Sequence, residues 1–151
     1  MYYTLNYIQK KLIDINYHLY ASIKYLDKHG YPKTVNDLSK YSFISYGRGA
    51  PSPVFNPDWA LKLGMKDGKK RKTVMKVNSV YGLLLAVQSG VGVAALPDYL
   101  TVNVPNIVKV LPKIEGPITE AHFVYPQSLK NVARVQAFRN FLYSKISEWK
   151  F

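Results

Sequence analysis

The segment of residues 77–100 constrains the fold of this chain more than any other, because it indicates a strand, a helix, a glycine stop and a second strand without a break. Apolar residues recur at helical spacing over residues 80–87, and Asn78 or Ser79 before them can accept a hydrogen bond from an amide of the first turn. Gly90 follows where such a helix should end, because glycine reaches the left-handed stop conformation at low cost.

The residues after this helix indicate a strand that is buried on both faces. Residues 91–96 are continuously apolar, as in a sheet with parallel neighbours. Pro97 closes this strand and is expected to occupy the first position of another helix. Because strand and helix patterns alternate over residues 34–111, the sequence predicts an α/β unit with a mostly parallel sheet.

Local patterns predict further elements on either side of this segment. Residues 15–20 alternate as in a strand, and Ser22 can cap a short helix that ends at Gly30. Thr34 and Asp37 have the spacing of a capping box, which predicts a second short helix. Strands are expected at residues 43–46, 73–77, 107–111 and 119–125, a short helix at 59–63, and an amphipathic helix at 132–149. Residues 1–13 show no clear periodicity.

Two segments lie where a ligand would bind. In α/β sheets, ligands sit beyond the carboxyl ends of the strands, where helix N-termini offer free amides. The segments that follow two expected strands are Ser45, Tyr46, Gly47 and Arg48, and then Asn78 and Ser79. The guanidinium of Arg48 could hold a carboxylate through two parallel hydrogen bonds. An exposed arginine on a flexible loop is the alternative interpretation.

Motifs for catalysis, cofactors and metals are missing from the sequence. The chain has no cysteine, which excludes disulfides and thiolate chemistry. It also lacks the nucleophile elbow, the zinc-protease motif and the phosphate loop, and Gly90 and Gly92 form only half of a dinucleotide fingerprint. The histidines fall in separate elements, and each aspartate adjoins a turn or helix start. We therefore expect no catalytic residue, no metal and no cofactor.

The formal net charge of +12 favours an acidic partner, but its distribution weakens that interpretation. Seven of the positive charges fall within residues 62–76, which contain an Asp-Gly turn. Nucleic-acid surfaces usually interleave aromatic residues with basic ones, and this segment has none. A solvated basic loop is the favoured interpretation. A phosphate-contacting patch and a contact to an acidic protein surface are the alternatives.

A family resemblance rests on Asn78, on residues 86–92 at the end of the predicted helix, and on residues 95–100. Matching elements occur in the same order before them, at residues 19–22, 25–26, 30–32, 37–38 and 43–44, and after them, at residues 108–111, 123–126 and 134–139. With these features, the chain resembles the effector-binding domain of LysR-type transcriptional regulators.

The resemblance implies an α/β, periplasmic-binding-protein-like (type 2) effector domain with one complete Rossmann-like lobe and a remnant of the other. Residues 1–21 would be the remnant of the first lobe and the crossover strand, and residues 22–113 the second lobe. Residues 114–151 would be the return strand and C-terminal helix of the first lobe. The helix-turn-helix head and most of the first lobe would be absent, so the chain is expected to be truncated at its N-terminus.

The resemblance also implies a non-enzymatic function: sensing a small, possibly anionic effector bound between the lobes. The effector-binding positions that carry over are Ser45, Tyr46, Gly47, Arg48, Asn78 and Ser79. Homo-oligomers are expected, and DNA contact only through the absent head. Because the sequence has neither a long apolar run nor a secretion signal, we expect a soluble cytoplasmic protein without a membrane partner.

Two other functions compete with this one. A solute-binding protein of a transporter shares the two-lobed fold, although the missing signal sequence and the order of motifs argue against it. A basic nucleic-acid-binding module is the second alternative, and a steep dependence of affinity on salt would identify it.

Overall fold

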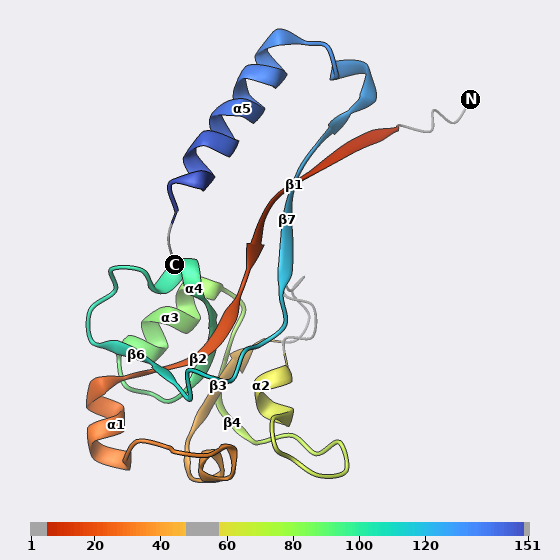
Figure 1. Cartoon of the computed structure of the whole chain (residues 1–151). Helices are drawn as coiled ribbons and strands as arrows, with labels where there is room; N and C mark the ends of the chain where they lie inside the picture. The colour runs from red at the N-terminus through yellow and green to blue at the C-terminus, as the bar shows by residue number, and fades with distance from the viewer. Residues whose placement is uncertain (1–5, 48–57, 150–151) are drawn as a thin grey trace. The chain divides into compact units, whose positions relative to one another are not determined.

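The computed structural model describes residues 6–47 and 58–149, which belong to two compact units (Figure 1). The central unit comprises residues 16–118, and the terminal unit is built from the residues up to 15 and from 119 onward. Within the described ranges, no helix is long and apolar enough to cross a membrane.

The central unit alternates strands with short helices. Its strands are β2 (Tyr17–Ser22), β3 (Phe43–Tyr46), β4 (Thr73–Val77), β5 (Ala94–Pro97) and β6 (Ile107–Val110). Its helices are α1 (Ile23–His29), the 3-10 helix η1 (Val35–Lys40), α2 (Trp59–Lys62), α3 (Val80–Gln88) and α4 (Asp98–Thr101). All of these elements except η1, which is a 3-10 helix, are of the type that the sequence predicts.

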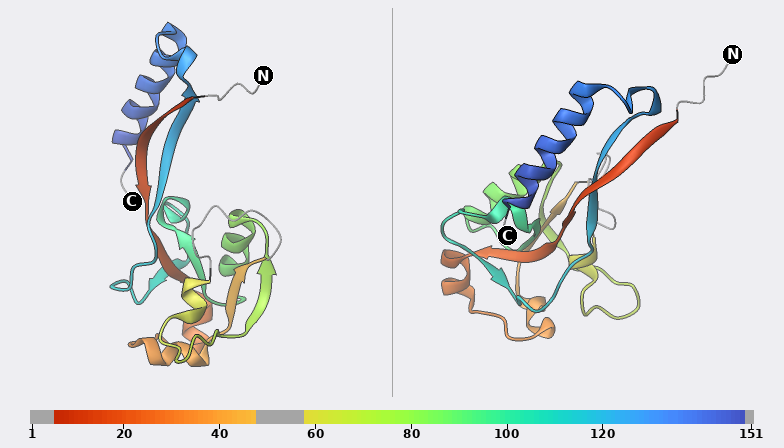
Figure 2. Two further views of the ribbon diagram at one scale, coloured as in Figure 1. Left: turned by 90° about the vertical axis from the view of Figure 1, so that its right-hand side faces the viewer. Right: turned by 45° about the horizontal axis from the view of Figure 1, so that its top comes forward.

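The strands within residues 34–111 run in one direction, as predicted, but β2 runs in the opposite direction. β3 and β4 are parallel (Figure 2). A parallel bridge between Phe43 and Val93 joins β3 to the start of β5. The strand β2, however, lies between β5 and β6 and is antiparallel to both. Every residue of β2 is buried. A continuous apolar pattern indicates burial on both faces but carries no information on the direction of neighbouring strands. The prediction of parallel neighbours for β5 was therefore wrong for β2, although it holds for β3.

Helix α3 has the two ends that the sequence predicts. At its start, Oγ of Ser79 accepts a hydrogen bond from the amide of Gly82 at 3.3 Å. At its end, Gly90 has a φ of 77°, and its amide donates to the carbonyl of Val87 while the amide of Val91 donates to that of Ala86. This pair of bonds is a Schellman motif, which satisfies carbonyls that the last turn of a helix leaves free.

The shorter helices also begin where polar side chains can cap them. Ser22 accepts from the amide of Tyr25 at the start of α1, and Thr34 and Asp37 form the predicted capping box of η1. Pro97 departs from its prediction, because it is the N-cap of α4 and the helix begins at Asp98. An N-cap residue needs extended dihedrals, which proline adopts readily with its φ of −69° and ψ of 137°.

Two clusters of buried apolar side chains hold the central unit together. One cluster joins Leu26 of α1 and Leu38 of η1 to Phe43, and the other joins Val87 of α3 to Ile44. Phe43 and Ile44 are neighbours on β3, so their side chains point to opposite faces of the sheet. The two clusters therefore cover opposite faces and fix β3 between them. Full burial of one such side chain typically contributes about 1.5–3 kcal/mol.

The terminal unit is a two-stranded ribbon with one long helix. β1 (Tyr7–Ile15) pairs antiparallel with β7 (Thr119–Pro126), and the register shifts between Lys11 and Ile13. The sequence analysis missed β1, because its exposed and half-buried residues do not alternate regularly. After the short 3-10 helix η2 (Gln127–Leu129), the chain forms α5 (Ala133–Ser147), as predicted.

Helix α5 packs only lightly on the ribbon of its own unit. The rings of Phe123 and Phe138 have centroids 5.8 Å apart, and the hydroxyl of Tyr143 donates to the carbonyl of Lys11. Every residue of α5 is at least partly exposed, and the side chains of Phe138 and Phe141 are 53% and 55% exposed. An apolar stripe with this exposure is available for contact with other surfaces.

Candidate functional site

The parallel strands β3 and β4 end beside each other and bring most of the predicted site residues together. Tyr46 is opposite Val77 in the strand register, and the amide of Gly47 donates to the carbonyl of Val77 at 2.8 Å. The hydroxyl of Tyr46 donates to the carbonyl of Asn78 at 2.9 Å. Ser79 follows directly as the N-cap of α3. Tyr46, Gly47, Asn78 and Ser79 therefore lie at one edge of the sheet.

The other two predicted residues have different positions. Ser45 is buried on β3, with 6% of its surface exposed, and faces two depressions described below. Arg48 lies outside the described residues. The start of α3 makes this edge favourable for negative charge. The first amides of a helix have no hydrogen-bond partner within the helix and attract anions.

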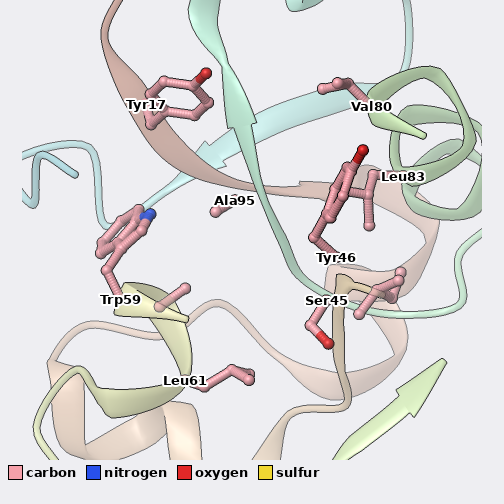
Figure 3. A pocket seen from close by; sticks show the side chains of 10 residues that line it. Tyr17, Ser45, Tyr46, Trp59, Leu61, Val80, Leu83 and Ala95 are labelled. Atoms are coloured by element: carbon pink, nitrogen blue, oxygen red, sulfur yellow. The ribbon is translucent and has the colours of Figure 1, made fainter. Parts of the chain in front are cut away.

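A small apolar pocket, with about 30 Å³ of space open to a water-sized molecule, lies beside this edge (Figure 3). Ser45 and Tyr46 line it together with Tyr17 of β2, Trp59 of α2 and Ala95 of β5, and with Ile44, Ala60, Leu61, Val80 and Leu83. The sequence analysis did not identify Tyr17 or Trp59 as site residues. Each had been assigned only to a secondary-structure element, and no local pattern indicates that β2 and α2 come together at this pocket.

The basic segment of residues 62–76 forms one wall of a second depression, of about 360 Å³, which Ser45 and Tyr46 also line. Its lysines are exposed, as the solvated-loop interpretation requires, and Lys70 pairs with Asp58. Arg71 departs from that interpretation. Its guanidinium donates to the carbonyls of Ala60, Leu63 and Val35 and lies 5.3 Å above the ring of Phe43. Burial lowers the pKa of Arg71, which here holds the core together.

A buried polar cluster lies around Asp98, which the sequence analysis had interpreted as a turn or capping residue. Nδ1 of His18 is 2.8 Å from Oδ1 of Asp98, and the hydroxyl of Tyr20 donates to the same oxygen at 2.9 Å. Nζ of Lys109 donates to Oδ2 at 2.8 Å. Asp98 makes no side-chain cap for α4, so its interpretation as a capping residue was wrong.

The environment of Asp98 favours its charged form. Burial alone would raise the pKa of its carboxyl, but the hydrogen bonds from Lys109, His18 and Tyr20 outweigh burial, and the pKa of Asp98 is lower than usual. Burial, followed by the negative charge of Asp98, raises the pKa of the Tyr20 hydroxyl, so Tyr20 stays neutral and donates its proton. The cluster is a satisfied ionic network inside the sheet rather than a reactive centre.

Comparison with known proteins shows which family this sequence matches. The sequence model of the LysR substrate binding domain family matches residues 6–146. An uncharacterized HTH-type transcriptional regulator of Haemophilus influenzae is 26% identical over 123 residues, which cover 79% of this chain and 41% of that protein. The chain thus spans less than half the length of this relative.

Solved structures show the same fold at lower sequence identity. The regulatory domain of CrgA, a LysR-type transcriptional regulator from Neisseria meningitidis, superposes with a TM-score of 0.77 at 21% identity, covering 97% of this chain and 72% of that chain. The regulatory domain of AphB from Vibrio vulnificus has a TM-score of 0.65 at 18% identity, with 92% and 68% covered. The mixed α/β architecture is therefore that of regulatory domains of this kind.

Proposed function

Since this chain belongs to the LysR substrate binding domain family, a non-enzymatic family, we propose that it is the effector-sensing part of a transcription regulator. In this proposal a small, anionic molecule binds at the edge formed by Ser45, Tyr46, Gly47, Asn78 and Ser79, and Arg48 is a further residue proposed to contact it. The observation that carries the proposal is the meeting of the carboxyl ends of β3 and β4 with the start of α3. This is where α/β folds bind ligands.

We further propose how the family's two lobes correspond to this chain. Residues 22–113 form one complete lobe, residues 1–21 contribute the crossover strand and part of the other lobe, and residues 114–151 return to that other lobe. The effector lies between the lobes. Operator DNA is contacted by a helix-turn-helix domain rather than by these residues, because no recognition helix pattern occurs in this sequence.

The test of the proposed site is calorimetric titration of a panel of mono- and dicarboxylates. We expect binding by this chain to be weak, about millimolar, because one lobe alone leaves a ligand largely in water. Arg48→Ala should weaken a bound carboxylate by about tenfold, since charge-assisted hydrogen bonds contribute about 1.5–3 kcal/mol.

Arg134→Ala, which removes an exposed arginine from α5, is the matched control and should leave the affinity unchanged. Equal affinities for the parent chain and Arg48→Ala would show that Arg48 does not contact the ligand. Micromolar or tighter binding by the chain alone would show that the ligand is enclosed elsewhere.

The exposed stripe of α5 leads us to propose that the chain forms homo-oligomers. Burial of Phe138 and Phe141 in a second copy would remove apolar surface from water. We expect light scattering at high protein concentration to give a mass above the 17.2 kDa of the monomer. The double variant Phe138→Ser and Phe141→Ser should return the mass toward 17.2 kDa.

Tyr31→Ser is the control for that experiment, because Tyr31 is 55% exposed but lies in the central unit. It should not change the mass. A monodisperse monomer for the parent chain would contradict the proposal.

A further inference from the structure

The apolar pocket beside the proposed effector site has an uncharged lining. All of the described residues that line it are neutral, and most of them, including Ile44, Leu83 and Val80, are aliphatic or aromatic. A small, strongly hydrated anion gains nothing from such walls, because burying a charge without a partner is costly. The pocket is instead suited to an apolar group. Since Ser45 and Tyr46 belong both to its lining and to the proposed site, one ligand can occupy both.

One polar group beside the pocket is not used by the part of the chain that the structure describes. Nε1 of Trp59 is buried, and within residues 6–47 and 58–149 it has no hydrogen-bond acceptor. In Figure 3 the indole nitrogen points toward the space between Tyr17 and Ala95. Buried donors without an acceptor are rare in folded proteins and call for an explanation. The indole N–H can only donate, so the missing partner must be an acceptor.

The position of this donor is fixed by the chain that crosses it. The amide of Gly116 donates to the carbonyl of Tyr17 at 2.7 Å, which brings Gly116 directly onto the indole. A Cβ at Gly116 would lie 2.6 Å from Cζ2 of Trp59 and 2.9 Å from the Tyr17 carbonyl oxygen, so only glycine fits there. The ring therefore has little freedom on that side, and its N–H is held in place before any ligand binds.

We propose that the effector is an apolar, ring-bearing molecule with a carbonyl or carboxylate oxygen, and that this oxygen accepts a hydrogen bond from Nε1 of Trp59. This inference rests on the proposed function and specifies the chemical class of its ligand. The apolar body fills the space between Tyr17, Ile44 and Leu83. Because Nε1 is covered and the pocket has space for only a water-sized molecule in this structure, side chains of the lining move apart when the ligand enters, and side-chain changes of this kind are common on binding.

Nuclear magnetic resonance tests the inference directly, because the chain has two tryptophans and so gives two indole N–H signals. Trp149→Phe identifies which signal belongs to Trp59. Four probes separate the contributions: phenylacetate and phenylacetamide carry a ring and an acceptor, acetate has the acceptor alone, and 2-phenylethylamine has the ring with a cationic donor. We expect the first two to move the Trp59 signal downfield and leave the Trp149 signal in place, and the last two to have little effect.

A second measurement uses substitution. Trp59→Phe should weaken phenylacetate binding by about fivefold, which corresponds to one net hydrogen bond, whereas Trp149→Phe should leave it unchanged.

If the amide signals of Gly47 and Ser79 move with phenylacetate but the Trp59 indole signal does not, the effector site stands and the ligand class is wrong. If acetate binds as well as phenylacetate, the apolar body contributes nothing and the inference is overturned. No response to any probe in the central unit would also overturn it, and the acid panel would then decide the proposed function by itself.

Discussion

Asp98→Ala is expected to lower the free energy of unfolding of the central unit by about 3 kcal/mol or more. The Asp98 carboxylate is 6% exposed and is the common partner of His18, Tyr20 and Lys109. Its removal leaves a buried hydroxyl and an ammonium group without their acceptor, and breaking a buried ion pair from one side typically costs about 3–5 kcal/mol. Because Lys109 is about one-third exposed and can be solvated, the lower end of that range applies.

The same network predicts a dependence on pH with a definite sign. The folded-state pKa of Asp98 lies below its usual value of 3.8, so the carboxylate contributes its full stabilisation above about pH 4. That contribution is lost as the pH falls from there through the lowered folded-state pKa. Asp98→Asn removes the titrating group while keeping its shape. The difference in unfolding free energy between the parent chain and Asp98→Asn should therefore shrink between pH 6 and pH 3.

Urea unfolding at several pH values, followed by circular dichroism, measures both effects. The control is Asp14→Ala, because Asp14 is exposed and pairs with the exposed Lys11. The free energy of unfolding of this variant should equal that of the parent chain at each pH. If Asp98→Ala lowers the free energy of unfolding no more than Asp14→Ala does, the buried network does not stabilise the fold.

Phe43→Ala should have a similarly large effect, about 3–5 kcal/mol, for a different physical reason. The side chain of Phe43 is fully buried in the cluster that joins α1, η1 and α2 to β3. Truncation of a buried phenylalanine removes its transfer free energy and leaves a cavity. It also removes the ring beneath the guanidinium of Arg71, whose pKa is already lowered by burial.

The matched control is Phe141→Ala, which makes the same chemical change at a side chain that is 55% exposed. Its cost should be below about 1 kcal/mol, as for surface substitutions in general. If urea unfolding shows the same decrease in unfolding free energy for both variants, Phe43 is not in the core. Because Ser45 and Tyr46 lie on the same strand β3 as Phe43, a destabilised Phe43→Ala variant should also lose ligand binding.

The parts of the fold that the sequence predicts are those determined by local hydrogen bonding. Ser79 and Gly90 mark the two ends of α3, because a capping hydroxyl and a left-handed residue are needed at those positions whatever surrounds them. The position of the candidate site follows from the same logic, since a helix that starts directly after a strand must expose its first amides at the carboxyl edge of the sheet.

The parts that it does not predict depend on contacts between distant residues. The antiparallel direction of β2 is set by its pairing with β5 and β6, and a run of buried residues has the same pattern in either direction. Trp59 and Tyr17 line one pocket only because the fold brings α2 and β2 together there. Likewise, Asp98 looks like a helix-start residue until His18 and Lys109 are brought beside it.

The most direct test of the proposed site is a map of backbone amide signals in the isotope-labelled chain, titrated with the tightest acid of the calorimetric panel. If a ligand binds at the carboxyl edge of β3 and β4, the largest changes will occur at Gly47, Ser79 and Gly82. Two other depressions serve as internal controls, one lined by Val35 and Lys113 and one lined by Lys10 and Gln136. Largest changes at either of those places, with Gly47 and Ser79 unmoved, would contradict the proposed site.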